Sequence, residues 1–340
     1  MNPSDISPII HEKAPLILAE IQKANSILLH CHPSPDPDSV CSALAMKFAC
    51  EQLGKKATVI RGDSSAISDG FLHFPGTQTI VGKSFGEINL KDFDLFIIVD
   101  SGSPDRISSK NTPIFPLPIR TINIDHHKSN ESFADINLVD TCVSTTFILF
   151  QLFTLWNISM THEIALNLFI GMYTDSGGFK YRPIDYKVFQ ALPILVKEAP
   201  DFVDAIFKME NSERKESIFF EALALGSIQT FLDGNMAIAS VTYKQIQDNH
   251  IPIEAIHTDI PNKLKSVVGW NIGMVLTERE PGFVKVSMRS RDVDKFDVSR
   301  LAVALGGGGH RAAAGIPFKG ISIEEARDRI VSKAKELYNL

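Results

Sequence analysis

The chain has 340 residues, of which 44% are hydrophobic and 22% charged, and its formal net charge is −6. This length allows two domains of ordinary size, and the composition is that of a folded globular protein rather than a disordered or fibrous one. The negative net charge argues against non-specific binding along long nucleic acid, which needs a basic surface, but it allows binding of a short or small phosphorylated ligand.

Neither a secretory signal nor a membrane span is expected. The start of the chain, Met1 to Asp5, lacks a basic segment followed by an apolar one, and no apolar run is long enough to cross a bilayer. The four cysteines show no CxxC spacing and mostly lie in apolar segments, as buried reduced thiols do. The sequence therefore predicts a cytoplasmic protein without membrane contact.

The first half of the chain predicts a parallel sheet. After a helix around 16–24, the apolar run 26–31 predicts a buried strand. A loop with three prolines follows, and then a helix over 39–53 that Gly54 ends. A strand over 57–60 completes a βαβ unit. Further predicted elements are strands over 94–100 and 120–124 and helices over 144–156 and 163–172.

The second half predicts a helical connector and a smaller domain. The pattern is helical from 185 to 232, and strands are predicted over 236–242, 272–277 and 283–290. A run of four glycines at 306–309 then precedes His310, and a last helix covers 323–337. The predicted fold is α/β, with a mainly parallel sheet flanked by helices over 1–184, a helical linker over 185–232, and an α/β domain with a glycine-rich phosphate-binding loop over 233–340.

Acids and histidines follow the predicted strands. His32, Asp36 and Asp38 come after the first strand, Asp100 ends another, and Asp125-His126-His127 follows a third; Asp175 comes after a helix. Ligands of open α/β sheets bind at this edge, so we expect these side chains to meet. Carboxylates gathered there would repel one another without cations, and a carboxylate and imidazole set without thiolate suits Mn²⁺ or Mg²⁺ better than structural zinc. The number of donors predicts two metals that activate a water for attack at phosphorus.

Each acid also has an ordinary structural alternative. Asp36 and Asp38 fit turn positions, Asp100 fits a helix cap, and Asp175 fits a loop beside two glycines. It is their joint occurrence at strand ends that favours a site.

Five segments together carry a family resemblance. In chain order they are His32-x-x-Pro35-Asp36-x-Asp38, Val99-Asp100, Asp125-His126-His127-x-x-Asn130, Thr174-Asp175-Ser176-Gly177, and Gly307-Gly308-Gly309-His310 with Ala313-Ala314-Gly315. With them the chain resembles the DHH phosphoesterases over nearly its whole length. The resemblance is to two-domain members with a DHH-associated C-terminal domain, such as the NrnA-type oligoribonucleases that also dephosphorylate 3′-phosphoadenosine 5′-phosphate.

The resemblance implies a role for each matching residue. His32 and Asp36 would bind one metal, Asp38, His126 and Asp175 the other, and Asp100 would bridge them, with Mn²⁺ as the first choice and Mg²⁺ as the alternative. In the catalytic pair, Asp125 would orient His126 and His127 would face the substrate phosphate. In the second domain, Gly307, Gly308, Gly309 and His310 would hold a phosphate, and Arg289, Ser290 and Arg291 would contact a second phosphate or the nucleotide.

Three positions depart from the family pattern. Pro37 and Cys41 stand where these proteins usually carry glycine, and Phe147 stands where a glutamate is common. None of these changes removes a proposed metal ligand.

The expected function is metal-dependent phosphohydrolysis in the cleft between the two domains. Its substrates would be short single-stranded RNA or DNA oligonucleotides or nucleotide phosphates, and the resemblance also allows a homodimer. The alternatives are a cyclic-di-AMP or pApA phosphodiesterase, and a nucleotide-binding regulatory protein that has lost turnover. A manganese pyrophosphatase would lack the glycine-rich second domain, and a RecJ-type exonuclease would be longer and need a basic channel.

Overall fold

The chain folds into two compact units. The structure, a computed structural model, describes residues 5–33, 35–63, 67, 69–181, 183–256 and 259–339. The first unit is Met1–Ser212 and the second Glu213–Leu340, and each has its own sheet and core. Over the described ranges, no helix combines the length and the apolar character needed to cross a lipid bilayer.

The first unit is built on a parallel sheet of five strands, in the order β2-β1-β3-β4-β5. The strands are β1 (Ser26–Cys31), β2 (Lys56–Arg61), β3 (Leu95–Val99), β4 (Arg120–Asp125) and β5 (Ile136–Val139). All five residues of β3 are buried, as expected for a central strand of a sheet covered on both faces. The predicted parallel sheet is confirmed. The short edge strand β5 was not predicted, because its four residues are mostly half-buried and carry no strong apolar pattern.

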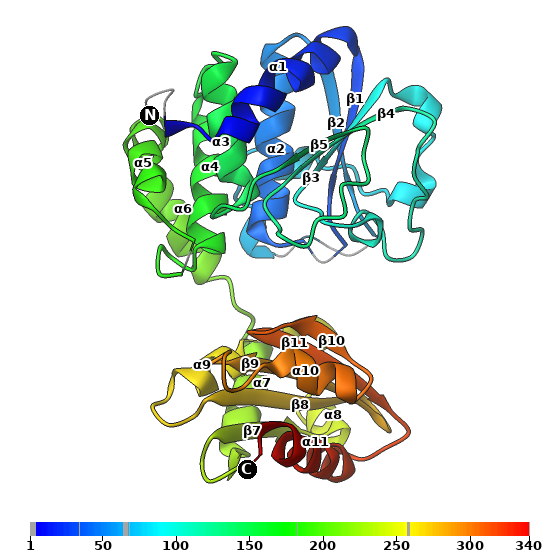
Figure 1. Ribbon diagram of the computed structural model, residues 1–340, viewed down its shortest axis with the longest axis vertical. Coiled ribbons are helices and arrows are strands. Elements are labelled where there is room, and N and C mark those ends of the chain that lie inside the picture. The colour runs from blue at the N-terminus through cyan, green and yellow to red at the C-terminus, as the bar shows by residue number, and fades with distance from the viewer. Residues whose placement is uncertain are drawn as a thin grey trace. The chain divides into compact units, whose positions relative to one another are not determined.

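Helices cover one face of this sheet (Figure 1). They are α1 (Pro8–Lys23), α2 (Pro37–Gln52), α3 (Thr145–Leu155) and α4 (His162–Asp175), and α5 (Tyr186–Glu198) and α6 (Phe202–Glu210) pack on α4. Helix α2 is buried on nearly every side, because it lies between the sheet and the pair α3 and α4. Its apolar residues therefore face neighbours in all directions, which explains the weak amphipathic pattern of the sequence.

Loops and short 3₁₀ turns cover the opposite face. Leu28, Phe96 and Ile98 of the strands pack there against Phe85 and Ile107, which come from irregular segments. The 3₁₀ turns η4 (Phe85–Glu87), η5 (Leu90–Asp92) and η6 (Pro104–Arg106) belong to this layer. Helices thus cover one face of this sheet, and loops with 3₁₀ turns cover the other.

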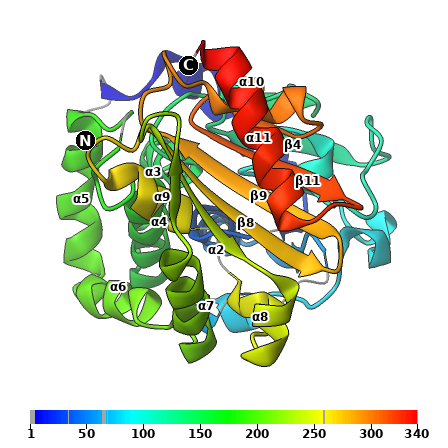
Figure 2. The same cartoon turned by 90° about the horizontal axis from the view of Figure 1, so that it is seen from below.

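The second unit contains a mixed sheet of six strands, in the order β10-β11-β9-β8-β7-β6, in which only β7 and β8 are parallel neighbours. The strands are β6 (Gln229–Phe231), β7 (Met236–Val241), β8 (Ile272–Glu280), β9 (Phe283–Ser290), β10 (Gly308–His310) and β11 (Ala313–Lys319). Helices α10 (Val298–Ala304) and α11 (Ile323–Tyr338) cover one face, and Figure 2 shows α11 lying across the sheet. Helices α7 (Lys215–Gly226), α8 (Tyr243–Asp248) and α9 (Ile260–Ser266) pack on β7 and β8 from the other side.

Two local predictions for this unit are wrong. The end of the stretch predicted as helical, 185–232, contains the strand β6. The glycine run was predicted as a loop, but Gly308–His310 forms an edge strand that pairs antiparallel with β11. Glycine is a weak strand former, so the ladder with β11, rather than local preference, determines this conformation.

Candidate metal site

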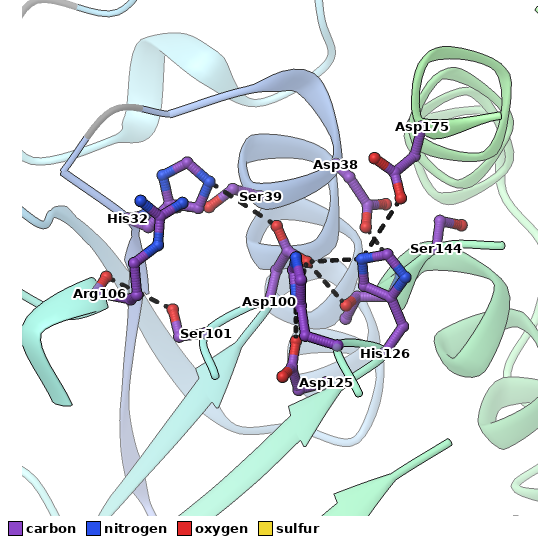
Figure 3. A network of polar contacts seen from close by, with 12 residues as sticks. His32, Asp38, Ser39, Asp100, Ser101, Arg106, Asp125, His126, Ser144 and Asp175 are labelled. Carbon is purple, nitrogen blue, oxygen red and sulfur yellow. Dashed lines mark hydrogen bonds and ion pairs between the residues drawn. The ribbon is translucent and has the colours of Figure 1, made fainter. Parts of the chain in front are cut away.

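Strand ends and helix ends bring the predicted ligands of the first unit together (Figure 3). His32 follows β1, Asp100 follows β3, and Asp125 and His126 lie at the end of β4. Asp36 caps the N-terminus of α2, where its carboxylate accepts a hydrogen bond from the Ser39 amide at 2.9 Å. The remaining two acids are Asp38, in the first turn of α2, and Asp175, in the last turn of α4.

Asp100 stands between two groups of donors. Its Oδ2 lies 3.8 Å from His32 Nε2, which is itself 3.3 Å from Asp36 Oδ2. Its Oδ1 lies 3.5 Å from His126 Nε2, and that nitrogen is 3.3 Å from Asp175 Oδ2. Asp38 completes the second group, whose three ligand atoms lie within 4.8 Å of one another, as do those of the first group. The structure thus gathers the six residues that were predicted as metal ligands into two sets with Asp100 at the centre.

The backbone of Asp100 is in the left-handed region, with φ 54°. This conformation is uncommon for a residue other than glycine and needs support from its surroundings. Thr145 gives that support by donating a hydrogen bond from Oγ1 to Asp100 Oδ1 at 3.0 Å. The side chain is 2% exposed, and burial, followed by the neighbouring carboxylates with Asp38 first, raises the pKa of Asp100 well above its ordinary value.

The N-terminus of α3 fixes Asp38. The amides of Thr145 and Thr146 donate to its two oxygens at 2.7 and 3.1 Å, and Thr146 Oγ1 donates at 2.7 Å. A carboxylate at a helix N-terminus is favoured by the orphan amides and by the helix dipole. Gly171 of α4 lies against this junction, because a Cβ there would come within 2.6 Å of Asp38 Oδ1 and 2.4 Å of Thr146 Cγ2.

The two adjacent histidines have different partners, and the predicted role of Asp125 is wrong in this respect. Asp125 Oδ1 accepts a hydrogen bond from His127 Nδ1 at 2.7 Å, whereas His126 Nδ1 lies 3.2 Å from the carbonyl oxygen of Cys142. The hydrogen bond with Asp125 raises the pKa of His127. Asn130 Nδ2 donates to the other oxygen of Asp125 at 2.7 Å. Asp125 therefore orients His127, and a backbone carbonyl orients His126.

The donor chemistry of the site fits divalent cations. Burial, followed by repulsion from Asp38 and Asp36, raises the pKa of Asp175 to about 8. Carboxylates in such a cluster either take up protons or are neutralised by bound cations. Imidazole nitrogens and carboxylate oxygens suit Mn²⁺ and Mg²⁺ better than thiolate-selecting metals. The residues of this site could thus hold metal ions, with His32 and His126 each facing one side of Asp100.

The structure does not bring the predicted substrate residues of the second unit together in one pocket. Arg289, Gly308 and Gly309 line one pocket of about 660 Å³. Ser290 is 4% exposed and alternates with Arg289 along β9, so its place in the core argues against a direct substrate contact. Arg291 donates from NH1 to the Val267 carbonyl at 3.0 Å.

Gly307 immediately precedes β10, and His310 is the last residue of that strand. Gly307 lies so close to β11 that a Cβ there would come within 2.1 Å of the Gly315 carbonyl oxygen, and His310 ends β10 on the surface. The glycine at 307 is thus required by the packing of two backbones.

Each unit of the chain matches a known family of domains. A family model described as the DHH family, N-terminal domain, matches residues 26–172, and a second model, the DHHA1 domain, matches residues 239–339. The chain belongs to the DHH family. The first match holds every predicted metal ligand except Asp175, which lies three residues beyond its end.

Two relatives match over most of this chain and over most of their own length. The bifunctional oligoribonuclease and PAP phosphatase NrnA of Thermus thermophilus is 27% identical over 327 residues, covering 94% of this DHH-family chain and 93% of that protein. The probable bifunctional oligoribonuclease and PAP phosphatase NrnA of Streptococcus mutans is 25% identical over 310 residues, covering 88% of this chain and 91% of that protein.

Solved structures share the fold. An exopolyphosphatase-related protein from Bacteroides fragilis superposes with a TM-score of 0.86 at 23% identity, covering 97% of this chain and 98% of that chain. Exonuclease RecJ bound to manganese gives a TM-score of 0.50 at 14% identity, covering 96% and 94%.

The DHH domain also places one cation beside the site that the sequence did not single out. Arg106 of η6 is drawn on the His32 side of the site in Figure 3. Burial alone would raise the pKa of Asp36, but the hydrogen bond and charge of His32, the Ser39 amide and then the charge of Arg106 outweigh burial and lower that pKa. The position of Arg106 depends on how the loop after β3 folds back toward β1. The only available signal was its spacing of six residues from Asp100, which is weak by itself.

Proposed function

We propose that this DHH-family chain is a metal-dependent phosphohydrolase that cleaves phosphodiester or phosphomonoester bonds of short oligonucleotides and nucleoside phosphates. One observation carries the proposal, namely that the two oxygens of Asp100 face two separate groups of imidazole and carboxylate donors. The names of the relatives, oligoribonuclease and PAP phosphatase, support the substrate class. The predicted cytoplasmic location and the homodimer stay predictions.

In the proposed mechanism, His32 and Asp36 would hold one divalent cation, Asp38, His126 and Asp175 would hold a second, and Asp100 would serve both. Cations there, Mn²⁺ as first choice and Mg²⁺ as alternative, would supply Lewis-acid chemistry that activates water and neutralises phosphoryl oxygens.

The remaining residues position the substrate and the ligands. Asp125 holds His127 through Nδ1, which leaves Nε2 of this half-exposed ring to contact the phosphate. Arg106 adds a cation on the His32 side of the site. Thr145 and Thr146 keep Asp38 and Asp100 in place, so these carboxylates need little reorganisation during turnover.

Turnover of a substrate panel tests this proposal. Purified protein with Mn²⁺ is incubated with diadenylate, pApA, 3′-phosphoadenosine 5′-phosphate, cyclic-di-AMP and pyrophosphate, and products are separated by chromatography. We expect mononucleotide or phosphate release from one or more of the first three substrates. If neither Mn²⁺ nor Mg²⁺ supports release from any member of the panel, the chain is not the hydrolase proposed.

Asp100→Asn provides the matched variant. It keeps the shape of the side chain but removes the charge shared by both donor groups. We expect its activity to fall by more than about 100-fold, since even residues that only orient metal ligands are worth about 10–100-fold. Asp204→Asn, an exposed position on α6, serves as the control and should leave activity unchanged.

A further inference from the structure

The DHHA1 domain has a pocket on the part of its sheet formed by β9, β10 and β11. Along β9, Lys285, Ser287 and Arg289 point to the same side, because side chains alternate along a strand. Ser287 is paired with Val275, whose side chain packs in the cluster under α7, α8 and α9, so the pocket opens beside these helices. Its volume of about 660 Å³ is within the range of about 300–1,000 Å³ that small-ligand sites occupy.

The charged residues that line this pocket are all cations, namely Arg279, Lys285 and Arg289. Arg279 Nε is buried and has no hydrogen-bond partner, and among the residues that the structure describes no carboxylate forms an ion pair with Arg279 or Lys285. Burial lowers the pKa of both groups, and in Lys285 the charge of Arg279 adds to this effect. Cations gathered without acids in a half-buried pocket are suited to an anionic ligand.

The cations occupy two positions. Arg289 lies at the end of β9 near Gly308 and Gly309, whose backbones can approach a phosphate closely. Lys285 lies four residues back along β9, a separation of about 13 Å at roughly 3.3 Å per residue. Arg279 lies beside Lys285, because the neighbouring residues of β8 pair with that part of β9. The two backbone positions are thus far enough apart to hold two successive phosphates.

The surface between the two positions is made of small residues. Ser287, Ala313 and Gly315 form it, with Gly315 paired to Ser287 across the two strands. Phe283 and Pro317 lie at the end that holds Lys285 and offer an apolar surface on which a base can stack. An extended chain of nucleotides fits this arrangement, since its phosphates recur at intervals and its bases are planar.

We propose that Arg279 and Lys285 form a second phosphate-binding position which, with Arg289, selects short single-stranded oligonucleotides over nucleoside bisphosphates. This inference rests on the proposed function for the class of substrate and narrows it. The binding itself requires no turnover, so it can be measured separately from catalysis.

Equilibrium binding to the full chain tests the second position. Fluorescence anisotropy of labelled pentaadenylate is measured in EDTA, which prevents turnover, and unlabelled 3′-phosphoadenosine 5′-phosphate is used as a competitor. In Arg279→Gln/Lys285→Gln we expect pentaadenylate affinity to fall 10-fold or more, and the slope of log affinity against log salt to shrink by about 0.7, the contribution of one phosphate on a single strand. Affinity for the bisphosphate should change less than about twofold, because it is held at the Arg289 end.

Two further variants separate charge from folding. Lys333→Gln/Lys335→Gln removes the same charge from α11, which covers the opposite face of the sheet, and should bind pentaadenylate like the unchanged protein. Arg279→Lys/Lys285→Arg keeps both cations and should retain most of the affinity. If the charge-preserving variant binds as poorly as the double glutamine variant, the loss comes from packing and the proposal is wrong.

The results also distinguish the two proposals. No detectable binding of pentaadenylate, an unchanged affinity in the double glutamine variant, or an equal loss for both ligands would each overturn the second phosphate position while leaving the proposed hydrolase standing. Conversely, the double glutamine variant could lose only pentaadenylate binding while the unchanged protein cleaves no panel substrate. That result would support the second phosphate position and refute the proposed hydrolase.

Discussion

The backbone conformation of Asp100, together with a hydrogen bond to its side chain, places its carboxylate between the two donor groups. A left-handed residue at the end of β3 turns the chain, and the hydrogen bond from Thr145 holds the carboxylate with one oxygen toward each histidine. Nothing local in the sequence around Val99 predicts this conformation. It depends on α3, which lies about 45 residues further along the chain.

The histidine pair shows where residue patterns stop being informative. Alternation along an extended segment suggests that His126 and His127 have different roles, and their hydrogen-bond partners do differ. The two rings nevertheless lie side by side, with centroids 4.3 Å apart, and both approach Asp100 Oδ1. Which of them pairs with Asp125 depends on how the chain turns after β4, and the assignment made from the motif was wrong. The carbonyl of Cys142 could not be predicted as a partner, because any residue type supplies a carbonyl.

Arg106 provides the residue-scale prediction. If it contacts the substrate phosphate, Arg106→Ala should raise KM about 10- to 100-fold, as expected for loss of a charged hydrogen bond worth about 1.5–3 kcal/mol. Manganese affinity, measured by calorimetry on the same variant, should not fall, since Arg106 is not a metal ligand and its charge opposes cation binding. Arg106→Lys should recover part of the loss.

Arg120→Ala is the control for this measurement. Arg120 begins β4, at the end of the strand away from Asp125, and its ion pairs with Glu20 and Asp135 are on the surface, where such pairs contribute little. An unchanged KM in Arg106→Ala, equal to that of the control, would exclude the phosphate contact.

At the scale of elements, the junction of α2, α3 and α4 holds the second donor group. Asp38 comes from α2, its hydrogen-bond donors from α3, Asp175 from the end of α4, and Gly171 allows the three helices to approach. The sequence predicted these helices, although α4 extends three residues beyond the expected end at 172. It could not predict their close packing, because a glycine within a helix has many explanations.

Gly171→Ala tests the junction. The added Cβ would meet Thr146 and Asp38 at 2.4 and 2.6 Å, so the helices or Asp38 must move. We expect a loss of about 1–3 kcal/mol in the free energy of unfolding, typical of overpacking, measured by urea denaturation. Manganese affinity should fall with it, because Asp38 is displaced.

Gly82→Ala, in the same unit, is the matched control, since a Cβ there meets nothing within 4 Å. It should have little effect on either quantity. Normal manganese binding in Gly171→Ala would show that the junction tolerates the methyl group and that Asp38 is not held as described.

Short elements were the least predictable. Helices α8, α9 and α10 have six or seven residues each and carry too few turns for an apolar period to appear. The strand β10 consists of two glycines and a histidine and follows from its pairing with β11 alone. By contrast, the buried strands β1, β3 and β4 were predicted within one residue or so of their ends. Burial on both faces gives β3 an unbroken apolar run, and β1 and β4 keep apolar residues at most or alternate positions.

At the scale of the whole molecule, separate cores predict separate responses to metal. All six proposed ligands lie in the first unit, so only the form in which this unit is folded should gain stability from metal binding. The chain has two tryptophans, Trp156 in the first core and Trp270 beside the helices of the second. Each unit therefore carries its own fluorescent probe.

Thermal unfolding of two single-tryptophan variants measures this difference. In Trp270→Phe, which reports on the first unit, EDTA should lower the midpoint and Mn²⁺ at 100 times its Kd should stabilise by about 2.7 kcal/mol relative to the metal-free form. In Trp156→Phe, which reports on the second unit, the midpoint should be the same with and without metal. A metal-dependent shift of the midpoint confined to Trp156→Phe would show that the cation binds to the second unit, which would contradict the proposed site.

The unequal covering of the first sheet has an evolutionary consequence. The helical side contributes Asp36, Asp38 and Asp175, and changes there disturb the cation ligands directly. The irregular side contributes Arg106 from a surface loop, and loops tolerate insertions and replacements far better than packed helices. Descendants of this chain could therefore acquire new substrate preferences by remodelling one layer while inheriting the reactive centre from the other.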